Sequence, residues 1–322
     1  MKNRFNHILF TEVLAEDKEL VTKKFPGSLI SAEPLTGAKL IKAAYDKEIL
    51  CISIRSHLNA KVLSSLPKLK LIVTRSVGYD HIDLKKAKQQ KIVVCNVPDY
   101  GSHVISEFVF ALLLSGLRHI GKGDARVERD YKFSFSGLRG NALKGKTLGI
   151  IGTGKIGANV ARIASLGFLM KVIAHDIFPN KELAEVNHFK YTSLPTLFKQ
   201  ADIISLHCPL LPTTKHLINQ KSLSLMKKGV IVVNTSRGGL INSRSLTKAI
   251  KSGRVSHAFL DVLEHENNIK QDKELIKLPQ VIVTPHIAFY ADDSMYKMYT
   301  NAFEIIAAFL NKKPLSTVVT GI

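Results

Sequence analysis

The longest uninterrupted apolar run in the 322-residue chain covers residues 108–114, far short of the ~20 residues that a membrane-spanning helix needs. The N-terminal segment MKNRFNHILF contains no apolar core of a signal peptide and leads directly into a predicted strand. The chain also contains no low-complexity tract. These absences argue against a membrane protein, so we expect a cytoplasmic protein without a membrane partner.

Cysteine is scarce, and its distribution excludes two further classes. Cys51, Cys95 and Cys208 are odd in number, widely spaced and part of no metal or redox motif. Such a set fits neither a disulfide framework nor a cysteine metal centre. We therefore expect reduced, mostly buried thiols, and no metal site.

Acidic residues are outnumbered, with 26 of them against 46 basic residues, which gives a formal net charge of +20. This excess raises the question of a nucleic-acid partner. However, the first 100 residues hold 17 basic and 10 acidic residues, so the excess follows chain length and forms no basic arm or stripe. We interpret it as a general surface property that would also attract anionic substrates, and we expect no nucleic-acid partner.

The chain is long enough for two domains with good cores. In residues 1–100, apolar strand-like runs at 7–10, 49–54, 70–73 and 91–94 alternate with helical spacing at 59–66 and 83–90. This alternation predicts a small parallel sheet with helices on both faces. The loop at 74–80 directly follows a strand, and a turn at Gly78 has N–H groups that could hold a carboxylate; an ordinary loop glycine explains it equally well.

The stretch 146–176 contains the most informative pattern in the chain. An apolar strand at 147–151 is followed by Gly152, Gly154 and Gly157 in the spacing G-x-G-x-x-G, a helix at 158–166, and a strand at 172–174 that ends at Asp176. Glycines permit a tight turn and close approach of a pyrophosphate, and the helix N-terminus favours its negative charge. Asp176 can accept hydrogen bonds from a ribose 2′-OH and would repel a 2′-phosphate. The pattern therefore predicts binding of NAD in preference to NADP, and His175 and Lys181, which flank the acid, leave tolerance of NADP as the lesser alternative.

Four more strands are predicted beyond Asp176, at 203–206, 230–234, 258–261 and 281–284. The carboxyl ends of parallel strands meet at one edge of a sheet, where open α/β sheets bind ligands. Groups able to reach a ligand follow all four strands: Cys208 and Pro209, Thr235 to Arg237, residues 261–266, and Pro285 with His286. We expect these groups to converge on the edge that carries the glycine turn.

Three of these residues suit hydride transfer to a 2-oxo acid. The guanidinium of Arg237 matches a carboxylate and stays charged. His286 can protonate the new alkoxide, and Glu266 can hold one imidazole nitrogen. Singly, a histidine after a proline is more often structural, and an isolated Glu or Arg is usually a surface group, so the hypothesis rests on their joint placement after consecutive strands.

The domain boundaries follow from two segments. Residues 96–101 break the pattern with proline and glycine, and 292–310 have helical spacing and should pack on the first domain. We therefore predict one domain of residues 1–100 plus 290–322 and a second of residues 101–289. The apolar helix predicted at 104–117 is either core or an interface with a second subunit, and 133–143 is predicted to be a loop.

The sequence resembles the D-isomer-specific 2-hydroxyacid dehydrogenases, nearest the D-lactate dehydrogenase-like branch. The resemblance runs from about residue 69 to residue 310 and rests on SVGYDHID (76–83), NVPDYG (96–101), LGIIGTGKIG (148–157), DIISLHCPLLPTT (202–214), VNTSRGGLIN (233–242), LDVLEHE (260–266) and VTPHIAFY (283–290). It implies an α/β protein of two doubly wound parallel-sheet domains. One is a Rossmann NAD-binding domain, and the other is a flavodoxin-like substrate domain.

The resemblance also implies roles for individual residues. Arg237, Glu266 and His286 match the catalytic residues, and Val77, Gly78, Tyr100 and Arg237 match the substrate-binding residues. The cofactor-binding residues are Gly152, Thr153, Gly154, Lys155, Ile156, Gly157, Asp176, Cys208, Pro209, Thr214, Thr235, Ser236 and Asp261. The family further implies a homodimer built on the NAD-binding domains.

The function expected from these residues is reversible hydride transfer between NADH and a small 2-oxo acid in a cleft between the domains, with pyruvate and D-lactate as the favoured pair. Hydroxypyruvate, glyoxylate or 3-phosphoglycerate dehydrogenation is the alternative within the class. A dinucleotide-sensing binding protein, like the transcriptional corepressors that share this fold, is the alternative from a different class, because fold alone does not exclude it.

Overall fold

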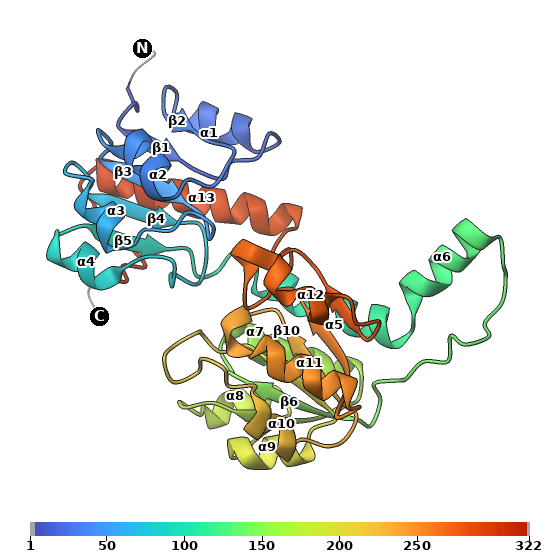
Figure 1. Cartoon of the computed structure of the whole chain (residues 1–322). Coiled ribbons are helices and arrows are strands. Elements are labelled where there is room, and N and C mark those ends of the chain that lie inside the picture. The colour runs from blue at the N-terminus through green and yellow to red at the C-terminus, as the bar shows by residue number, and fades with distance from the viewer. Residues whose placement is uncertain (1–3, 321–322) are drawn as a thin grey trace. The chain divides into compact units, whose positions relative to one another are not determined.

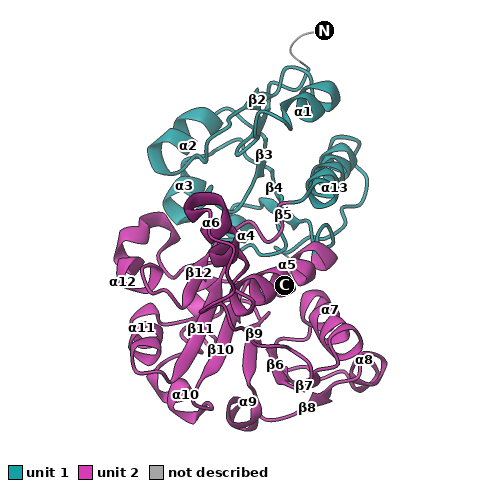
Figure 2. Ribbon diagram, turned by 90° about the vertical axis from the view of Figure 1, so that its right-hand side faces the viewer, with its two compact units in different colours: residues 1–101, 291–322 teal, residues 102–290 magenta. Residues whose placement is uncertain are grey.

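The computed structural model describes residues 4–320. The chain divides into two compact units (Figure 2). Unit 1 is formed by Met1–Gly101 and Ala291–Ile322, and unit 2 is formed by Ser102–Tyr290. The boundaries predicted from the sequence lie one residue away from these divisions.

Unit 1 contains a five-stranded parallel sheet in the order β2-β1-β3-β4-β5, which is the flavodoxin-like strand order. Its strands are β1 (Ile8–Phe10), β2 (Leu29–Ile30), β3 (Ile49–Ile52), β4 (Leu71–Thr74) and β5 (Val93–Asn96). Its helices are α1 (Lys18–Lys24), α2 (Gly37–Ala44), α3 (Ala60–Ser64), α4 (Leu84–Gln89) and α13 (Asp292–Leu310). Every residue of β1, β3 and β4 is buried, which explains why these strands are near-continuous apolar runs.

The structure corrects several strand boundaries predicted in unit 1. The strand predicted at 70–73 begins at Leu71, and the strand predicted at 91–94 begins at Val93. Leu71 and Val93 form the first pair in the register of β4 with β5, so both strands begin there. The strand predicted at 49–54 ends at Ile52, and β1 begins at Ile8 rather than at residue 7. β2 was not predicted, because two residues are too few to show a periodic pattern.

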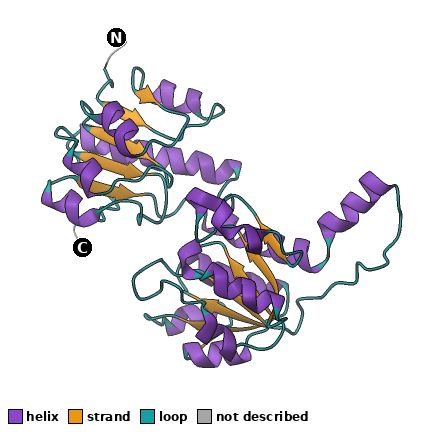
Figure 3. Ribbon diagram, viewed as in Figure 1, coloured by secondary structure: helices purple, strands orange, loops and turns teal. Residues whose placement is uncertain are grey.

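Unit 2 contains a seven-stranded parallel sheet in the order β12-β11-β10-β9-β6-β7-β8. The six consecutive strands from β8 to β11 follow the Rossmann order, and β12 extends the sheet beyond β11. The strands are β6 (Thr147–Ile151), β7 (Lys171–His175), β8 (Lys190–Tyr191), β9 (Ile203–Leu206), β10 (Val230–Asn234), β11 (Val255–Leu260) and β12 (Val281–Val283). Figures 1 and 3 show the helices that cover this sheet.

The helices of unit 2 are α5 (Ser102–Leu117), α6 (Ile120–Asp130), α7 (Lys155–Arg162), α8 (Lys181–Val186), α9 (Leu194–Gln200), α10 (Gln220–Leu225), α11 (Ser243–Lys251) and α12 (Lys273–Ile276). A π-helical turn, η1 (Ile163–Gly167), continues α7, and two 3₁₀ segments are η2 (Gly238–Leu240) and η3 (Glu266–Asp272). The helix predicted at 158–166 thus begins three residues earlier, because the turn of the glycine motif passes directly into α7.

Helices α5 and α6 differ sharply in burial. Half of α5 is buried, including Val109 and Leu113, and it packs in the core of unit 2 beside α7 and β11. α6 was not predicted, because its sequence contains two glycines and many charges; it has no buried residue and extends away from the rest of unit 2 (Figures 1 and 3). Residues 133–143 form a loop, as predicted.

No single helix among the described residues is long and apolar enough to cross a membrane. Together α5 and α6 meet that criterion on length and composition, with a bend of 57° between them. The burial of α5 inside unit 2 accounts for its apolar composition.

Candidate active site

The glycine turn has the shape that a dinucleotide requires. Gly152 has a φ of +94°, and a Cβ there would lie 2.6 Å from the backbone N of Cys208. A Cβ on Gly157 would lie 2.0 Å from the backbone O of Gly152, whereas one on Gly154 would meet no described protein atom within 4 Å. The first and third glycines are therefore required by the fold. The second borders open space at the N-terminus of α7, which begins at Lys155, so a pyrophosphate can approach there.

Asp176 follows β7 and is held beside the glycine turn. Its Oδ2 accepts hydrogen bonds from the backbone N–H and the hydroxyl of Thr153, at 2.6 and 3.0 Å, and its Oδ1 accepts one from Phe178 N at 2.9 Å. Partial burial raises the pKa of Asp176, but the N–H donors of Thr153 and Phe178 outweigh burial and lower the pKa overall. Asp176 is thus an ionised acceptor, which suits a ribose diol.

Thr235 provides a second test of whether the residues present fit NAD. Its Oγ1 is buried and has no hydrogen-bond partner among the described residues. A buried hydroxyl without a partner costs free energy that a bound molecule can recover. Together with the open space beside Gly154, this hydroxyl fits a bound dinucleotide.

Four further predicted cofactor residues, Cys208, Pro209, Thr214 and Ser236, lie in loops that are joined by hydrogen bonds. Ser236 Oγ donates to the carbonyl of Cys208 at 2.8 Å, and Thr214 Oγ1 donates to the carbonyl of Pro209 at 2.6 Å. Burial raises the pKa of the Cys208 thiol to about 11, so this cysteine is neutral and does not act as a nucleophile. Ile156 packs against the core of unit 2.

His286 and Glu266 form a pair. His286 Nδ1 lies 3.1 Å from Glu266 Oε2, and the imidazole side chain is 15% exposed. Glu266 therefore orients the imidazole ring through Nδ1, and this pair does not use Nε2. His286 also has a φ of +59°, a left-handed conformation that is unusual for a side chain of this size. Three other histidines among the described residues, His119, His188 and His216, share a positive φ, so the conformation is a local property of the loop.

Asp261 holds the His286 loop in this conformation. Its Oδ1 accepts hydrogen bonds from Thr284 Oγ1 at 2.5 Å and Ile287 N at 2.9 Å, and its Oδ2 accepts one from Ala288 N at 2.8 Å. Burial raises the pKa of Asp261, and these donors offset only part of that effect. The structure thus gives this residue, predicted as a cofactor contact, the additional task of positioning His286.

Arg237 lies between β10 and η2. Its Nη1 donates to the carbonyl of Ser236 at 2.8 Å, and its own carbonyl accepts from Asn234 Nδ2 at 2.8 Å. Arg237, Glu266 and His286 follow β10, β11 and β12, three neighbouring strands of one parallel sheet. The sheet therefore brings the three predicted catalytic residues to one edge.

The segment that carries Glu266 is fixed by residues that the sequence analysis missed. Glu264 accepts from Ser243 N at 2.8 Å and pairs with His216 Nε2 at 2.5 Å. The buried Asp272 accepts from the backbone N and the Nδ1 of His265, at 3.1 and 3.0 Å. Glu264, His265 and Asp272 each offer one atom that could coordinate a metal ion, and these three atoms lie within 4.8 Å of one another. The hydrogen bonds described above explain why the three side chains lie together without an ion.

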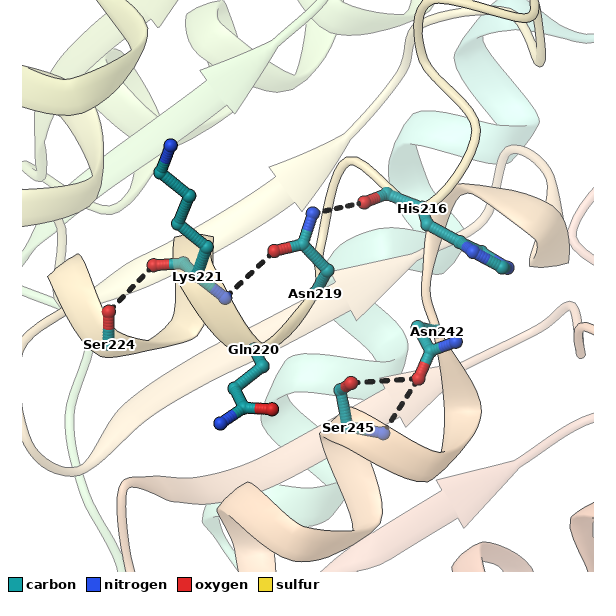
Figure 4. Close-up of a pocket in the computed structure, with 7 residues that line it drawn as sticks. All are labelled: His216, Asn219, Gln220, Lys221, Ser224, Asn242 and Ser245. Carbon is teal, nitrogen blue, oxygen red and sulfur yellow. Dashed lines mark hydrogen bonds between the residues drawn. The ribbon is translucent and has the colours of Figure 1, made fainter.

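His216 also lines an open groove of about 580 Å³ at the beginnings of α10 and α11 (Figure 4). The other lining residues are Asn219, Gln220, Lys221, Ser224, Asn242 and Ser245. Asn219 and Asn242 are the N-cap residues of the two helices, so their side-chain oxygens are used by backbone N–H groups. None of the predicted catalytic or cofactor residues lines this groove.

The predicted substrate residues Val77 and Gly78 lie in a loop of unit 1, and the carbonyls of residues 76–78 all accept hydrogen bonds. Ser76 Oγ donates to Gly78 O at 2.6 Å, Asn96 Nδ2 to Val77 O at 2.7 Å, and Val97 N to Ser76 O at 3.1 Å. Among the hydrogen bonds of residues 4–320, none uses the N–H of Val77 or Gly78. Two backbone donors are thus available to an anion.

Two further features of unit 1 support this loop. Arg75 is buried and donates from Nη2 to Thr11 O at 2.7 Å and Glu12 O at 2.9 Å, with its guanidinium 4.8 Å from the centre of the Tyr299 ring. Tyr100, predicted to lie beside the substrate, is buried in unit 1. The role of Arg75 was not predicted, because its partners are backbone carbonyls distant in the sequence.

Residues 110–288 match the family model described as "D-isomer specific 2-hydroxyacid dehydrogenase, NAD binding domain". The chain is 38% identical over 259 residues to a hydroxypyruvate reductase from Thermotoga maritima (80% of this chain, 83% of the relative) and 36% identical over 289 residues to a D-lactate dehydrogenase from Escherichia coli (85% and 87%). A D-lactate dehydrogenase from Aquifex aeolicus, solved with NAD and lactic acid, superposes with a TM-score of 0.86 at 34% identity, covering 95% of this chain and 96% of that one.

Proposed function

Because the chain belongs to the D-isomer-specific 2-hydroxyacid dehydrogenase family, and is therefore an NAD-dependent oxidoreductase acting on the CH–OH group, we propose that its reaction is the reduction of pyruvate to D-lactate. The observation that carries the proposal is the His286–Glu266 pair on the same sheet edge as Arg237. These residues supply an acid and a cation for a small 2-oxo acid. The similarity to D-lactate dehydrogenases supports pyruvate as the substrate.

In the proposed mechanism, the guanidinium of Arg237 binds the substrate carboxylate and polarises the C2 carbonyl. The chemistry that NADH supplies when bound is hydride transfer. His286 donates the proton of Nε2 to the C2 oxygen, while Glu266 keeps the other imidazole nitrogen in place. In the oxidative direction, His286 accepts that proton from the hydroxyl of the 2-hydroxy acid.

Unit 1 serves as the substrate-binding domain in this proposal. The N–H groups of Val77 and Gly78 bind a carboxylate oxygen, because the carbonyls of this loop are already held by the protein. A small 2-oxo acid needs few other polar contacts, since most of its polar atoms belong to the carboxylate and the carbonyl.

Hydroxypyruvate is the second candidate substrate, and the hydroxypyruvate reductase among the relatives is the observation that favours it. The net charge of +20 would also suit a phosphorylated acid such as 3-phosphohydroxypyruvate, but no dedicated phosphate cluster is present in the described part of unit 1.

The experiment that separates these substrates is NADH oxidation by the purified protein with pyruvate, 2-oxoisocaproate, phenylpyruvate, glyoxylate, hydroxypyruvate and 3-phosphohydroxypyruvate. We expect the highest kcat/KM with pyruvate. A higher value with hydroxypyruvate would replace the proposed substrate. NADH binding without turnover on any acid would instead favour a dinucleotide-sensing protein.

We also propose a homodimer built on unit 2. α6 has no buried residue, and its apolar side chains Ile120 and Val127 are exposed. Tyr131, Phe133 and Phe135 in the loop that follows are each more than 90% exposed. Contiguous exposed apolar side chains of this kind mark interaction surfaces, and a second copy of the chain is the partner that the family resemblance favours.

A further inference from the structure

We propose that Tyr191, through Thr153, positions Asp176 and thereby determines the preference for NAD over NADP. Tyr191 is the last residue of β8, at the edge of the unit 2 sheet. Nothing in the sequence marks it as part of the cofactor site, because it follows Thr153 by 38 residues and resembles any strand tyrosine.

The hydroxyl of Tyr191 joins two parts of the cofactor site. It lies 2.8 Å from Thr153 Oγ1 in the glycine turn, and it accepts a hydrogen bond from Asn180 N at 3.1 Å in the loop after Asp176. Thr153 Oγ1 in turn donates to Asp176 Oδ2 at 3.0 Å. One tyrosine hydroxyl therefore links the glycine turn, the acidic residue and the loop between β7 and α8.

The first and last groups of this hydrogen-bond series, Asn180 N and the Asp176 carboxylate, determine the direction of every hydrogen bond between them. A backbone N–H can only donate, so Asn180 N donates to the Tyr191 oxygen. An ionised carboxylate can only accept, so the Thr153 hydroxyl donates to Asp176. The proton between them must therefore belong to Tyr191, which donates to Thr153 Oγ1. Each donor is satisfied only in this arrangement.

The consequence for Asp176 is that its two oxygens are not equivalent. Oδ2 accepts two hydrogen bonds from Thr153, whereas Oδ1 accepts one from Phe178 N. Oδ1 is the oxygen with more remaining capacity for a ribose diol. The backbone N–H and the hydroxyl of Thr153 both restrain Oδ2 on the turn, and Tyr191 acts on the hydroxyl part of this restraint. In the proposal, this restraint keeps the carboxylate in place to repel a 2′-phosphate.

Two residues that flank Asp176 in the sequence carry groups that could otherwise bind a 2′-phosphate. Lys181 begins α8, and His175 precedes Asp176, with its Nδ1 3.1 Å from Thr192 O. If Asp176 were free to turn aside, these groups would favour NADPH. The hydroxyl chain from Tyr191 therefore acts on specificity and not only on the stability of β8.

The test is Tyr191→Phe, which removes the hydroxyl and keeps the ring that packs edge-on against Phe189. The dissociation constants of NADH and NADPH are measured by quenching of nucleotide fluorescence, together with kcat and KM. We expect the ratio of the two constants, NADPH to NADH, to fall about five-fold, the effect of one neutral hydrogen bond, with KM for NADH raised and kcat retained. Tyr296→Phe, which removes a hydroxyl from an exposed tyrosine of α13, is the matched control and should change neither constant.

A double-mutant cycle separates positioning from general stability. In an Asp176→Asn background, Tyr191→Phe should no longer change the NADPH to NADH ratio, because the charge that it positions is gone. If Tyr191→Phe does not fold, Thr153→Val interrupts the same chain and should lower the same ratio. An unchanged ratio, or equal weakening of both nucleotides, would overturn the proposal.

Discussion

At the scale of single residues, the site depends on side chains that are fixed before any ligand binds. His286 has a left-handed backbone conformation, and Asp261 holds that conformation with hydrogen bonds to both carboxylate oxygens. Pre-organisation of this kind lowers the cost of reaching the reactive geometry. The proposed mechanism therefore depends on the positioning residue Asp261 as well as on the residues proposed to touch the substrate.

Replacement of Asp261 by asparagine tests this dependence. An amide offers one oxygen where the carboxylate offers two, so at least one buried donor near His286 loses its acceptor. We expect the free energy of unfolding to fall by about 1–3 kcal/mol and kcat to fall as well. Chemical denaturation and steady-state kinetics measure the two effects.

Asp202→Asn is the control for Asp261→Asn, because Asp202 also accepts a backbone hydrogen bond, from Thr147 N, but at the amino-terminal edge of the sheet. It should lower stability without lowering kcat. Equal effects on kcat from the two variants would show that Asp261 acts through general stability alone.

His207 predicts a pH dependence of stability. Burial lowers the pKa of this histidine to about 4, so the unfolded chain binds a proton more readily than the folded chain between that value and the ordinary 6.5. The free energy of unfolding therefore has its full value above pH 6.5 and falls as the pH decreases from 6.5 to about 4. The total decrease from this histidine is on the order of 3 kcal/mol. Denaturation of His207→Gln should show a flatter profile from pH 6.5 to 4, and an unchanged slope would contradict the assignment.

At the scale of elements, buried strands were predictable and partly exposed elements were not. β6, β9 and β10 occupy the predicted residues, because strands covered on both faces are continuous apolar runs. The exposed α6 and the two-residue strands β2 and β8 have no such pattern. The fold class follows from the sequence because the buried strands alone determine the alternation of a parallel α/β sheet.

The positions of Arg237, Glu266 and His286 after three neighbouring strands were predictable for the same reason, since each follows a recognisable strand, and their catalytic roles remain a prediction. Tyr191, Asp272 and Arg75 were not, because their partners are distant in the sequence or are backbone atoms. Contacts of this kind depend on tertiary packing, and a single sequence contains no periodic signal for them.

The glycine turn predicts opposite results for two alanine substitutions. Gly157→Ala places a Cβ 2.0 Å from the backbone O of Gly152, so the turn must shift, and we expect a lower Tm and loss of NADH binding. Gly154→Ala meets no described protein atom within 4 Å and has a φ of −63°, which alanine accepts. The Tm of Gly154→Ala should be unchanged. Its dissociation constant for NADH should rise at least about ten-fold, because the methyl group fills the space through which the pyrophosphate approaches the turn. Thermal unfolding and nucleotide titration separate the two, and unimpaired NADH binding by Gly154→Ala would place the pyrophosphate elsewhere.

At the scale of the whole molecule, two parallel sheets of different strand order carry the predicted substrate and cofactor residues, and the net charge of +20 is spread along the chain. A positive surface raises the local concentration of anions and accelerates their encounter with the protein. Both a 2-oxo acid and a dinucleotide carry negative charge, so the charge suits the proposed ligands.

The proposed dimer belongs to this scale as well. Light scattering should give the mass of a dimer for the native chain, and the double substitution Phe133→Ser with Phe135→Ser should shift it toward the monomer, because these rings are exposed within the protomer. Tyr45→Ser, an exposed aromatic position in unit 1, is the control and should leave the mass unchanged. A native monomer, or a dimer that survives the double substitution, would remove this surface from the interface.

The measurement that tests the central claim most directly is the product of pyruvate and NADH with the native protein and with His286→Ala, resolved by chiral chromatography. We expect D-lactate from the native protein and a rate at least about 10²-fold lower from the variant, with the dissociation constant of NADH unchanged, because the variant lacks the acid but keeps the cofactor site. Formation of L-lactate, or full turnover by His286→Ala, would contradict the account.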